Sequence, residues 1–355
     1  MRVILENTKN TSLPSQNEGY VAPATPVTST LTQVGLWEEE GTTVSHKYYP
    51  ENGSWSEQTF GKTANFATGH VNGMCYVIRL EDGSFIVVDG GHATDTQADN
   101  LYKTLVKQAE GKEVVIAAWI FTHAHEDHAG AFKKFTEKYH TMVTVESFIY
   151  NFPTEKAATS NNVSSPNLDD ITVAMDIYPE AKTVIAHAGQ VHYIRNAVVN
   201  ILYTYDMMMP YKMVDYNASS VVFNVKLEGS TILFLGDASG ESDNVDGELS
   251  YMADIYSKDT LGANIVQATH HGIDRHNKVK EFYSMIKDDV KYLLVPAADR
   301  YIVDGENYYD IGDRAALITL TKANAYYAGY SATILTLSDG AISISAAPID
   351  NYVNS

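Results

Sequence analysis

The segment FTHAHEDHAG, residues 121–130, restricts more than any other feature how this chain can fold. It places three histidines and an aspartate directly after a nearly continuous apolar run, which predicts a buried strand. Alternate side chains of an extended segment point to the same side, so His123 and His125 can share one cation. Asp127 and His128 follow at the turn into the next predicted helix and can serve a second cation. Because burying so many titratable groups without a cation is costly, the segment predicts two adjacent cation sites.

Three other predicted strands also end in residues that bind metals. Asp89 follows the run IVV, Asp237 follows ILFLG, and the pair His270 and His271 follows IVQAT. If these strand ends meet at one edge of a sheet, their side chains lie beside the histidine segment. Asp237 could then bridge the two cations, and His271 could complete the second site.

Apolar patterning predicts alternating strands and helices along most of the chain. Strands are expected at 74–80, 84–88, 114–121 and 144–150, and helices at 95–110 and 129–139. Many further short strands with interspersed helices follow toward the C-terminus. This order indicates an α/β protein in which two sheets pack face to face with helices outside.

Composition divides the 355 residues into an N-terminal arm and one large domain. Residues 1–33 are rich in Thr, Ser, Pro and Asn, which is typical of an arm or linker. Residues 34–355 are expected to form a single domain. Within it, 34–73 supply N-terminal strands and decoration, and 74–355 carry the motifs.

Charge and cysteine content exclude several classes of protein. Lys plus Arg number 25 against 44 for Asp plus Glu, and the resulting net charge of −19 disfavours binding of long nucleic acids. The single cysteine, Cys75, cannot form an intramolecular disulfide. No apolar stretch is long enough for a membrane span, and the first residues lack a signal-peptide pattern. We therefore expect a cytoplasmic protein that acts on a small molecule, or a secreted one if a leader was removed; the oligomeric state is left open.

The order of these motifs resembles that of the metallo-β-lactamase-like hydrolases, from about Gly73 to the C-terminus. The shared features are HxHxDH, the earlier strand ending in Asp-Gly-Gly, the later strand ending in Gly-Asp, and the late His-Gly. Within that superfamily, NASSVV at 217–222 and HHG at 270–272 are similar to the hydrolase domain of competence-type DNA-uptake channel proteins. The resemblance implies a four-layer αββα sandwich with its site at one edge of the sheets.

The resemblance also implies roles for individual residues. The implied metal ligands are His123, His125, Asp127, His128, Asp237 and His271, and the implied cofactors are two divalent metal ions, with zinc first and manganese or iron as alternatives. Asp89 would hydrogen-bond to the ligating loop from behind. His271 is preferred to His270 because it directly precedes a glycine, and His270 remains a possible ligand.

One family feature is missing from this sequence. Most members carry a further histidine between the HxHxDH and Gly-Asp motifs, but the corresponding stretch here, Leu202–Pro210, contains none. The first site would then hold two imidazoles and Asp237, or would recruit Asn217. A single metal ion per chain is the other outcome of this loss.

Hydrolysis by metal-activated water is the chemistry that such a site performs. Asp127 is the expected catalytic residue, because it can orient or deprotonate the water. A small phosphodiester or another anionic ester is the expected substrate, and Tyr301 and Tyr308 are candidate pocket residues. The alternatives are a carboxylic-ester or thioester hydrolase such as a lactonase, and a binding protein that has kept the fold with weakened catalysis.

Overall fold

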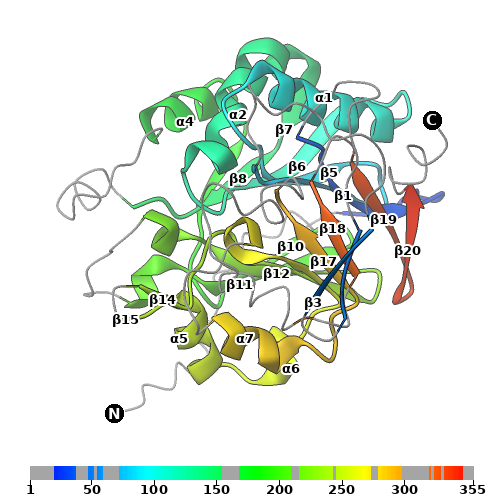
Figure 1. The fold of residues 1–355 in the computed structure, drawn as a ribbon. Coiled ribbons are helices and arrows are strands. Elements are labelled where there is room, and N and C mark those ends of the chain that lie inside the picture. The colour runs from blue at the N-terminus through cyan, green and yellow to red at the C-terminus, as the bar shows by residue number, and fades with distance from the viewer. Residues whose placement is uncertain are drawn as a thin grey trace.

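Two β-sheets lie face to face at the centre of the molecule, and helices cover both outer faces (Figure 1). The computed structural model describes residues 20–36, 47–51, 54–58, 72–153, 168–208, 216–242, 245–272, 279–297, 320, 324–328 and 332–346. Helices and sheets together make four layers in the order αββα. The expected fold class is therefore confirmed.

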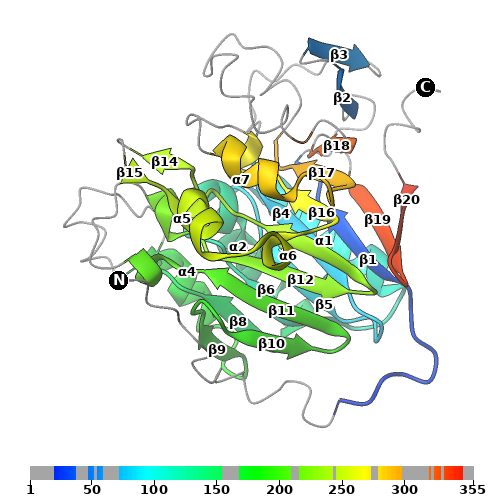
Figure 2. The same ribbon diagram turned by 90° about the horizontal axis from the view of Figure 1, so that it is seen from below.

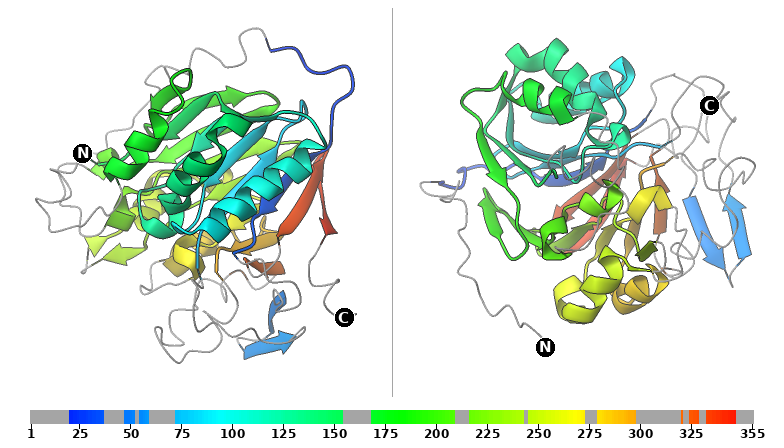
Figure 3. Two further views of the ribbon diagram at one scale, coloured as in Figure 1. Left: turned by 90° about the horizontal axis from the view of Figure 1, so that it is seen from above. Right: turned by 90° about the vertical axis from the view of Figure 1, so that its left-hand side faces the viewer.

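The first sheet has nine strands in the order β20-β19-β1-β4-β5-β6-β8-β9, with β7 beside β6. Its strands are β1 (Ser29–Gln33), β4 (Cys75–Arg79), β5 (Phe85–Asp89), β6 (Val114–Ile120), β7 (Val143–Val145), β8 (Ser147–Tyr150), β9 (Lys182–Ile185), β19 (Thr333–Ser338) and β20 (Ala341–Ala346). Helices α1 (Asp95–Ala109), α2 (Glu126–Tyr139) and α4 (Leu168–Met175) cover its outer face (Figure 3).

The second sheet also has nine strands, in the order β10-β11-β12-β13-β16-β17-β18-β2-β3. Its strands are β10 (Val191–Ile194), β11 (Ala197–Tyr203), β12 (Val222–Leu227), β13 (Ser230–Phe234), β16 (Ile265–Gln267), β17 (Tyr292–Val295), β18 (Asn324–Tyr327), β2 (Lys47–Glu51) and β3 (Ser54–Gln58). Helices α5 (Glu248–Ile255), α6 (Lys258–Leu261) and α7 (Val279–Ile286) lie on its outer face (Figure 2). No helix in the described part of the chain combines the length and apolar character that a membrane crossing requires.

Apolar side chains fill each of the three spaces between the layers. Trp119 packs edge-on against Phe132 and Phe135 of α2, with ring centroids 4.7 and 5.1 Å apart. Between the sheets, Tyr76 meets Phe234 at 5.3 Å. Both faces of β6 are covered, which explains why its sequence is almost continuously apolar.

Parallel strands bring chemically important residues to one edge of the sandwich. In the first sheet, β5, β6, β8 and β9 are parallel to one another. In the second, β13, β16, β17 and β18 are parallel. Parallel strands have their carboxyl ends at the same edge of a sheet, and open α/β sheets bind ligands there. Asp89 lies at the end of β5, the HxHxDH segment follows β6, Asp237 follows β13, and His270 and His271 follow β16.

The N-terminal segment differs from its sequence-based assignment as an arm or linker over residues 1–33. Ser29–Gln33 form β1, which pairs antiparallel with both β4 and β19. Leu31 is fully buried in the core between the sheets, so one apolar residue and two pairing partners outweigh the polar composition of the segment. The domain boundaries themselves stay a prediction.

His192 on β10 gives the fold a testable pH dependence. Its side chain is fully buried, and neither ring nitrogen has a hydrogen-bond partner among the described residues. Burial lowers its pKa to about 4, whereas a histidine of the unfolded chain has a pKa of about 6.5. Because the unfolded state binds the proton first, this contribution to stability is complete above about pH 6.5 and is lost as the pH falls toward 4.

We expect about 3 kcal/mol of unfolding free energy to disappear across that window in the wild type, because each pKa unit corresponds to about 1.4 kcal/mol. His192→Leu removes this term. Urea unfolding of both proteins at pH 7 and pH 4.5 measures the difference. An identical pH dependence in the two proteins would contradict the assignment.

Candidate metal centre

The HxHxDH segment continues directly from β6 into the first turn of α2. The helix begins at Glu126, three residues before the position that the sequence predicts, so Asp127 and His128 lie on its first turn. Gly90 and Gly91 donate their N–H groups to the carbonyl oxygen of His128, at 2.6 and 2.9 Å. The end of β5 therefore holds this turn against the sheet.

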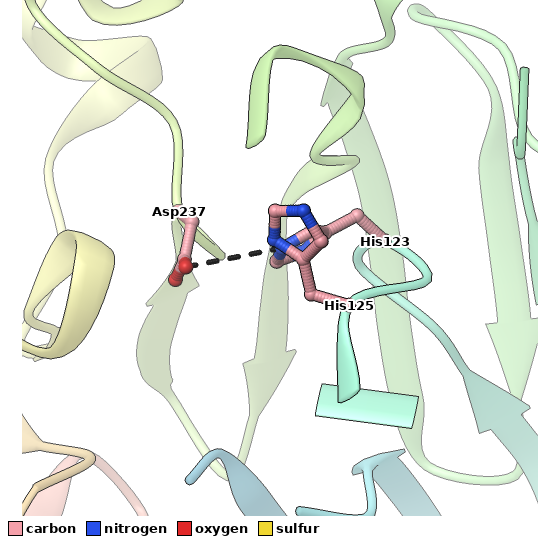
Figure 4. A group of neighbouring side chains, drawn as sticks. All are labelled: His123, His125 and Asp237. Carbon is pink, nitrogen blue, oxygen red and sulfur yellow. Dashed lines mark hydrogen bonds and ion pairs between the residues drawn. The ribbon is translucent and has the colours of Figure 1, made fainter. Parts of the chain in front are cut away.

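His123, His125 and Asp237 form one compact group of candidate ligands. Figure 4 shows the two imidazoles beside the Asp237 carboxylate, which comes from the opposite sheet. His123 Nε2 lies 3.0 Å from His125 Nδ1 and 3.8 Å from Asp237 Oδ2. His123 and Asp237 are buried, whereas His125 is partly exposed.

Asp127, His128 and His271 form the second group. His271 Nε2 lies 2.9 Å from Asp127 Oδ2 and 3.3 Å from His128 Nε2. The other ring nitrogen of His271, Nδ1, lies 2.8 Å from the carbonyl oxygen of Pro296 and is oriented by it. Asp127 is the most exposed member, with 19% of its side chain accessible against 0% and 1% for the two histidines.

Asp237 lies between the two groups. Its Oδ1 is 3.0 Å from His128 Nε2, and its Oδ2 is 3.6 Å from His271 Nε2. The same Oδ2 faces His123 at 3.8 Å, so this carboxylate contacts imidazoles of both groups. The N–H of Asp237 donates to Ser220 Oγ at 3.0 Å, which fixes its backbone.

Asp89 holds the ligand segment from behind. Its Oδ1 accepts the N–H of Thr122 at 2.8 Å, and its Oδ2 accepts the Thr122 hydroxyl at 2.6 Å. His128 Nδ1 lies 2.8 Å from the same Oδ2, which leaves its Nε2 directed toward Asp237. A carboxylate on the far nitrogen of a ligating imidazole fixes the ring and its tautomer, as the sequence prediction for Asp89 requires.

The surroundings shift the pKa values of His123 and His128 in opposite directions. Burial lowers the pKa of His123 well below its usual value, and the neighbouring His128 and His125 lower it further. Burial also disfavours the charged form of His128, but Asp237 and Asp89 outweigh it and raise its pKa well above the usual value.

The remaining acidic and basic groups of the centre stabilise one another. Burial alone would raise the pKa of Asp237, yet His128 and His271 hold it well below its usual value. Burial would likewise raise the pKa of Asp127, but His271 holds it well below its usual value. Burial disfavours the protonated form of His271, but Asp237 and Asp127 raise its pKa.

The donor set fits divalent cations. Each group offers three ligand atoms that lie within 4.8 Å of one another, and all are imidazole nitrogens or carboxylate oxygens. Ligands about 2.1 Å from a shared cation lie up to roughly 4.2 Å apart, so only small movements separate this arrangement from coordination. His123 is neutral and can offer a lone pair to a cation. Zinc, iron and manganese all accept such mixed donors.

His270 and Asn217 lie at the margin of the centre. His270 Nε2 is 3.9 Å from Asp237 Oδ2 and 3.4 Å from Asn217 Nδ2. Both His270 and His271 adopt left-handed backbone angles, with φ of 46° and 58°, which is unusual for residues other than glycine. Such strain is typical of functional sites. Tyr301 and Tyr308 fall outside the described residues.

Sequence reasoning missed Asn72, which lies at the centre. Its side-chain amide donates to Asp127 Oδ2 at 2.6 Å, and its Oδ1 lies 3.4 Å from His92 Nε2. Asn72 comes from the segment that the sequence analysis treated as decoration. An isolated β-bridge to Ala297 brings Asn72 to the site, and the local sequence does not predict that pairing.

Comparisons with known proteins place this geometry in context. A family model described as the metallo-beta-lactamase superfamily matches residues 68–294. A search of the curated proteins found no match. Among solved structures, the chain is similar to the metallo-beta-lactamase fold protein YhfI from Bacillus subtilis, with 11% identity, a TM-score of 0.47, and coverage of 87% of this chain and 100% of that one.

Two further structures are also similar to this chain. Tm1679, a metal-dependent hydrolase of the beta-lactamase superfamily, has 11% identity and a TM-score of 0.46, with 87% of this chain and 100% of that one covered. A diphosphatase from the PhnP family has 14% identity and a TM-score of 0.39, with 75% and 85% covered.

The position of Asp237 between the two groups predicts how metal content responds to mutation. We expect about two equivalents of a divalent metal in the wild type, and about one in His125→Ala and in His271→Ala, because each substitution removes a ligand from one group. Asp237→Ala should retain less than either. Elemental analysis of untagged protein purified without chelator measures this. Wild-type content in Asp237→Ala would contradict the bridging position.

Proposed function

The chain belongs to the metallo-β-lactamase superfamily of metal-dependent hydrolases, and on that premise we propose that it hydrolyses a small phosphodiester or another small anionic ester. The observation that carries this proposal is the position of Asp237, which contacts imidazoles of both candidate ligand groups. A carboxylate in that position suits two adjacent cations rather than one. Two cations side by side would lower the pKa of water and neutralise the charge that develops during displacement at phosphorus.

Asp127 is the residue proposed to handle the attacking water. Its pKa lies well below the usual value, chiefly because His271 outweighs the effect of burial, so the carboxylate is ionised at neutral pH. Its side chain is 19% exposed, so it can meet water. Asn72 donates to Oδ2, and we propose that Oδ1 accepts a hydrogen bond from that water. Asp127 is therefore proposed to orient the nucleophilic water.

Charge supports a small substrate over a polymer. A net charge of −19 opposes the approach of long polyanions to the molecule as a whole. Bound cations would make the site itself locally positive. A compact anionic ester meets both conditions, because it can reach the metals without lying along the acidic surface.

The finer assignment to the competence-type subgroup remains a prediction. It rests on the segment NASSVV at 217–222, where Ser220 accepts from the Asp237 N–H and Asn217 lies beside His270. These contacts give the segment a role at the site without selecting a substrate. Zinc, manganese and iron remain the metals to be compared.

The direct test is a hydrolysis screen with zinc, manganese or iron supplied. Bis-p-nitrophenyl phosphate represents phosphodiesters, and p-nitrophenyl acetate, a γ-lactone and a thioester represent the alternative substrates. We expect turnover of the phosphodiester, with kcat lowered at least about 100-fold in Asp127→Asn, because a neutral carboxamide orients the water and binds a cation less well than a carboxylate. His140→Gln is the matched control, since this exposed histidine lies at the other end of α2, about 20 Å from Asp127.

Three outcomes would contradict the proposal in different ways. Preference for the acetate, lactone or thioester would favour a carboxylic-ester or thioester hydrolase. An equal decrease of kcat in His140→Gln would contradict the proposed role of Asp127. A protein that binds metal but turns over none of the substrates would favour a binding protein on the same fold.

A further inference from the structure

The loops that deliver Asp237 and His271 follow two neighbouring parallel strands. β13 and β16 are paired through Ile232 with Ile265 and Leu233 with Val266. Beyond this register, β13 ends at Phe234 and β16 ends at Gln267. Beyond the ladder, the two loops are joined by a backbone bond from the His270 N–H to the Gly236 carbonyl oxygen and by bonds from side chains.

The side chain of Gln267 supplies several of these bonds. It is fully buried, and its Oε1 accepts the N–H groups of Leu235 and Gly236 at 2.7 and 2.8 Å. Its Nε2 donates to the carbonyl oxygen of Gly236 at 3.0 Å and to that of Ala268. A primary amide has two acceptor sites and two N–H donors, so all four are used.

Neighbouring bonds reinforce the same connection. The N–H of His270 donates to the Gly236 carbonyl oxygen at 3.0 Å, and the Thr269 hydroxyl donates to the carbonyl oxygen of Ala238. Gly236 itself has a φ of 55°, and a Cβ there would lie 2.9 Å from Ser220 Oγ. The loop before Asp237 is thus held between Ser220 on one side and Gln267 on the other.

We propose that Gln267 is a positioning residue that sets the distance between Asp237 and His271 and so couples the two metal-binding groups. Asp237 belongs to the first group and His271 to the second, and Gln267 hydrogen-bonds to the loop of each. None of the hydrogen bonds of Gln267 goes to a candidate metal ligand. Loss of its amide frees both loops at once, so both cations are held more weakly. The inference rests on the metal-binding part of the proposed function and does not depend on the substrate.

Gln33 offers a matched control for burial of a glutamine. It is 1% exposed, it lies on β1, and it also bonds across the core: its Nε2 donates to the Tyr326 carbonyl oxygen and its Oε1 accepts from the Tyr76 hydroxyl. These partners belong to β18 and β4 and include no candidate ligand. Gln33→Met and Gln267→Met therefore remove the same functional group from the same kind of environment.

The experiment measures zinc affinity and stability separately. Each apoprotein is titrated with zinc against a chromogenic chelator, and its unfolding by urea is followed in the presence of excess chelator. We expect Gln267→Met to bind both equivalents of zinc about 10- to 100-fold more weakly, the range found when partners of metal ligands are lost. Gln33→Met should lose comparable stability and keep wild-type zinc affinity.

The possible results separate this inference from the proposed function. Wild-type affinity in Gln267→Met, or weakening of one equivalent alone, would overturn the coupling role. If that variant does not fold, Gln267→Asn, whose amide is one methylene shorter, must show the same joint weakening. A wild type that binds zinc without hydrolysing any ester would reject the proposed function and leave the role of Gln267 intact, whereas a wild type that binds no divalent cation would reject both.

Discussion

A buried carboxylate surrounded by imidazoles is the constraint on which the architecture of this protein depends. The Asp237 side chain is 2% exposed and lies within 3.9 Å of ring nitrogens from His123, His128, His270 and His271. A charge buried to this degree is tolerated only when opposite charges or metal ions compensate it. The compensating groups come from both sheets, so the centre exists only when the two halves of the sandwich are assembled.

The same residues therefore connect the halves of the fold. Near the centre, the N–H of Val221 donates to the carbonyl oxygen of Thr122 at 2.8 Å and joins the β12 side to the β6 side. The N–H of Gly73 donates to Pro296, whose oxygen also faces His271 Nδ1. Backbone hydrogen bonds and contacts of the candidate ligands both join the two sheets at this edge of the sandwich. A metal ion bound between the two halves and the packing of the sheets would stabilise each other, because either one orders the loops that the other needs.

The sequence predicts the ends of strands better than the contacts between distant loops. The apolar run at 114–121 and the ligand-type residues after it are local signals. β6 lies where they indicate, α2 begins three residues earlier than predicted, and the structure brings the candidate ligands into two groups. β1 was missed because its strand character comes from pairing with β4 and β19, which are distant in sequence. Asn72 and Gln267 were missed for a related reason. The presence of one asparagine or glutamine in a sequence does not indicate which distant loop its side chain will contact.

Burial varies across the centre in a way that separates binding from chemistry. His123, His128, His271 and Asp237 are almost completely enclosed, and the side chains behind them, Asp89 and Gln267, are fully buried. Asp127, His125 and His270 are partly exposed. In the proposed function, the buried side chains would hold the cations, and the partly exposed Asp127 would meet the water molecule and the substrate. Asp127 lies on the first turn of α2, where the N–H of Met74 donates to its backbone carbonyl oxygen at 2.9 Å, and 19% of its side chain is accessible.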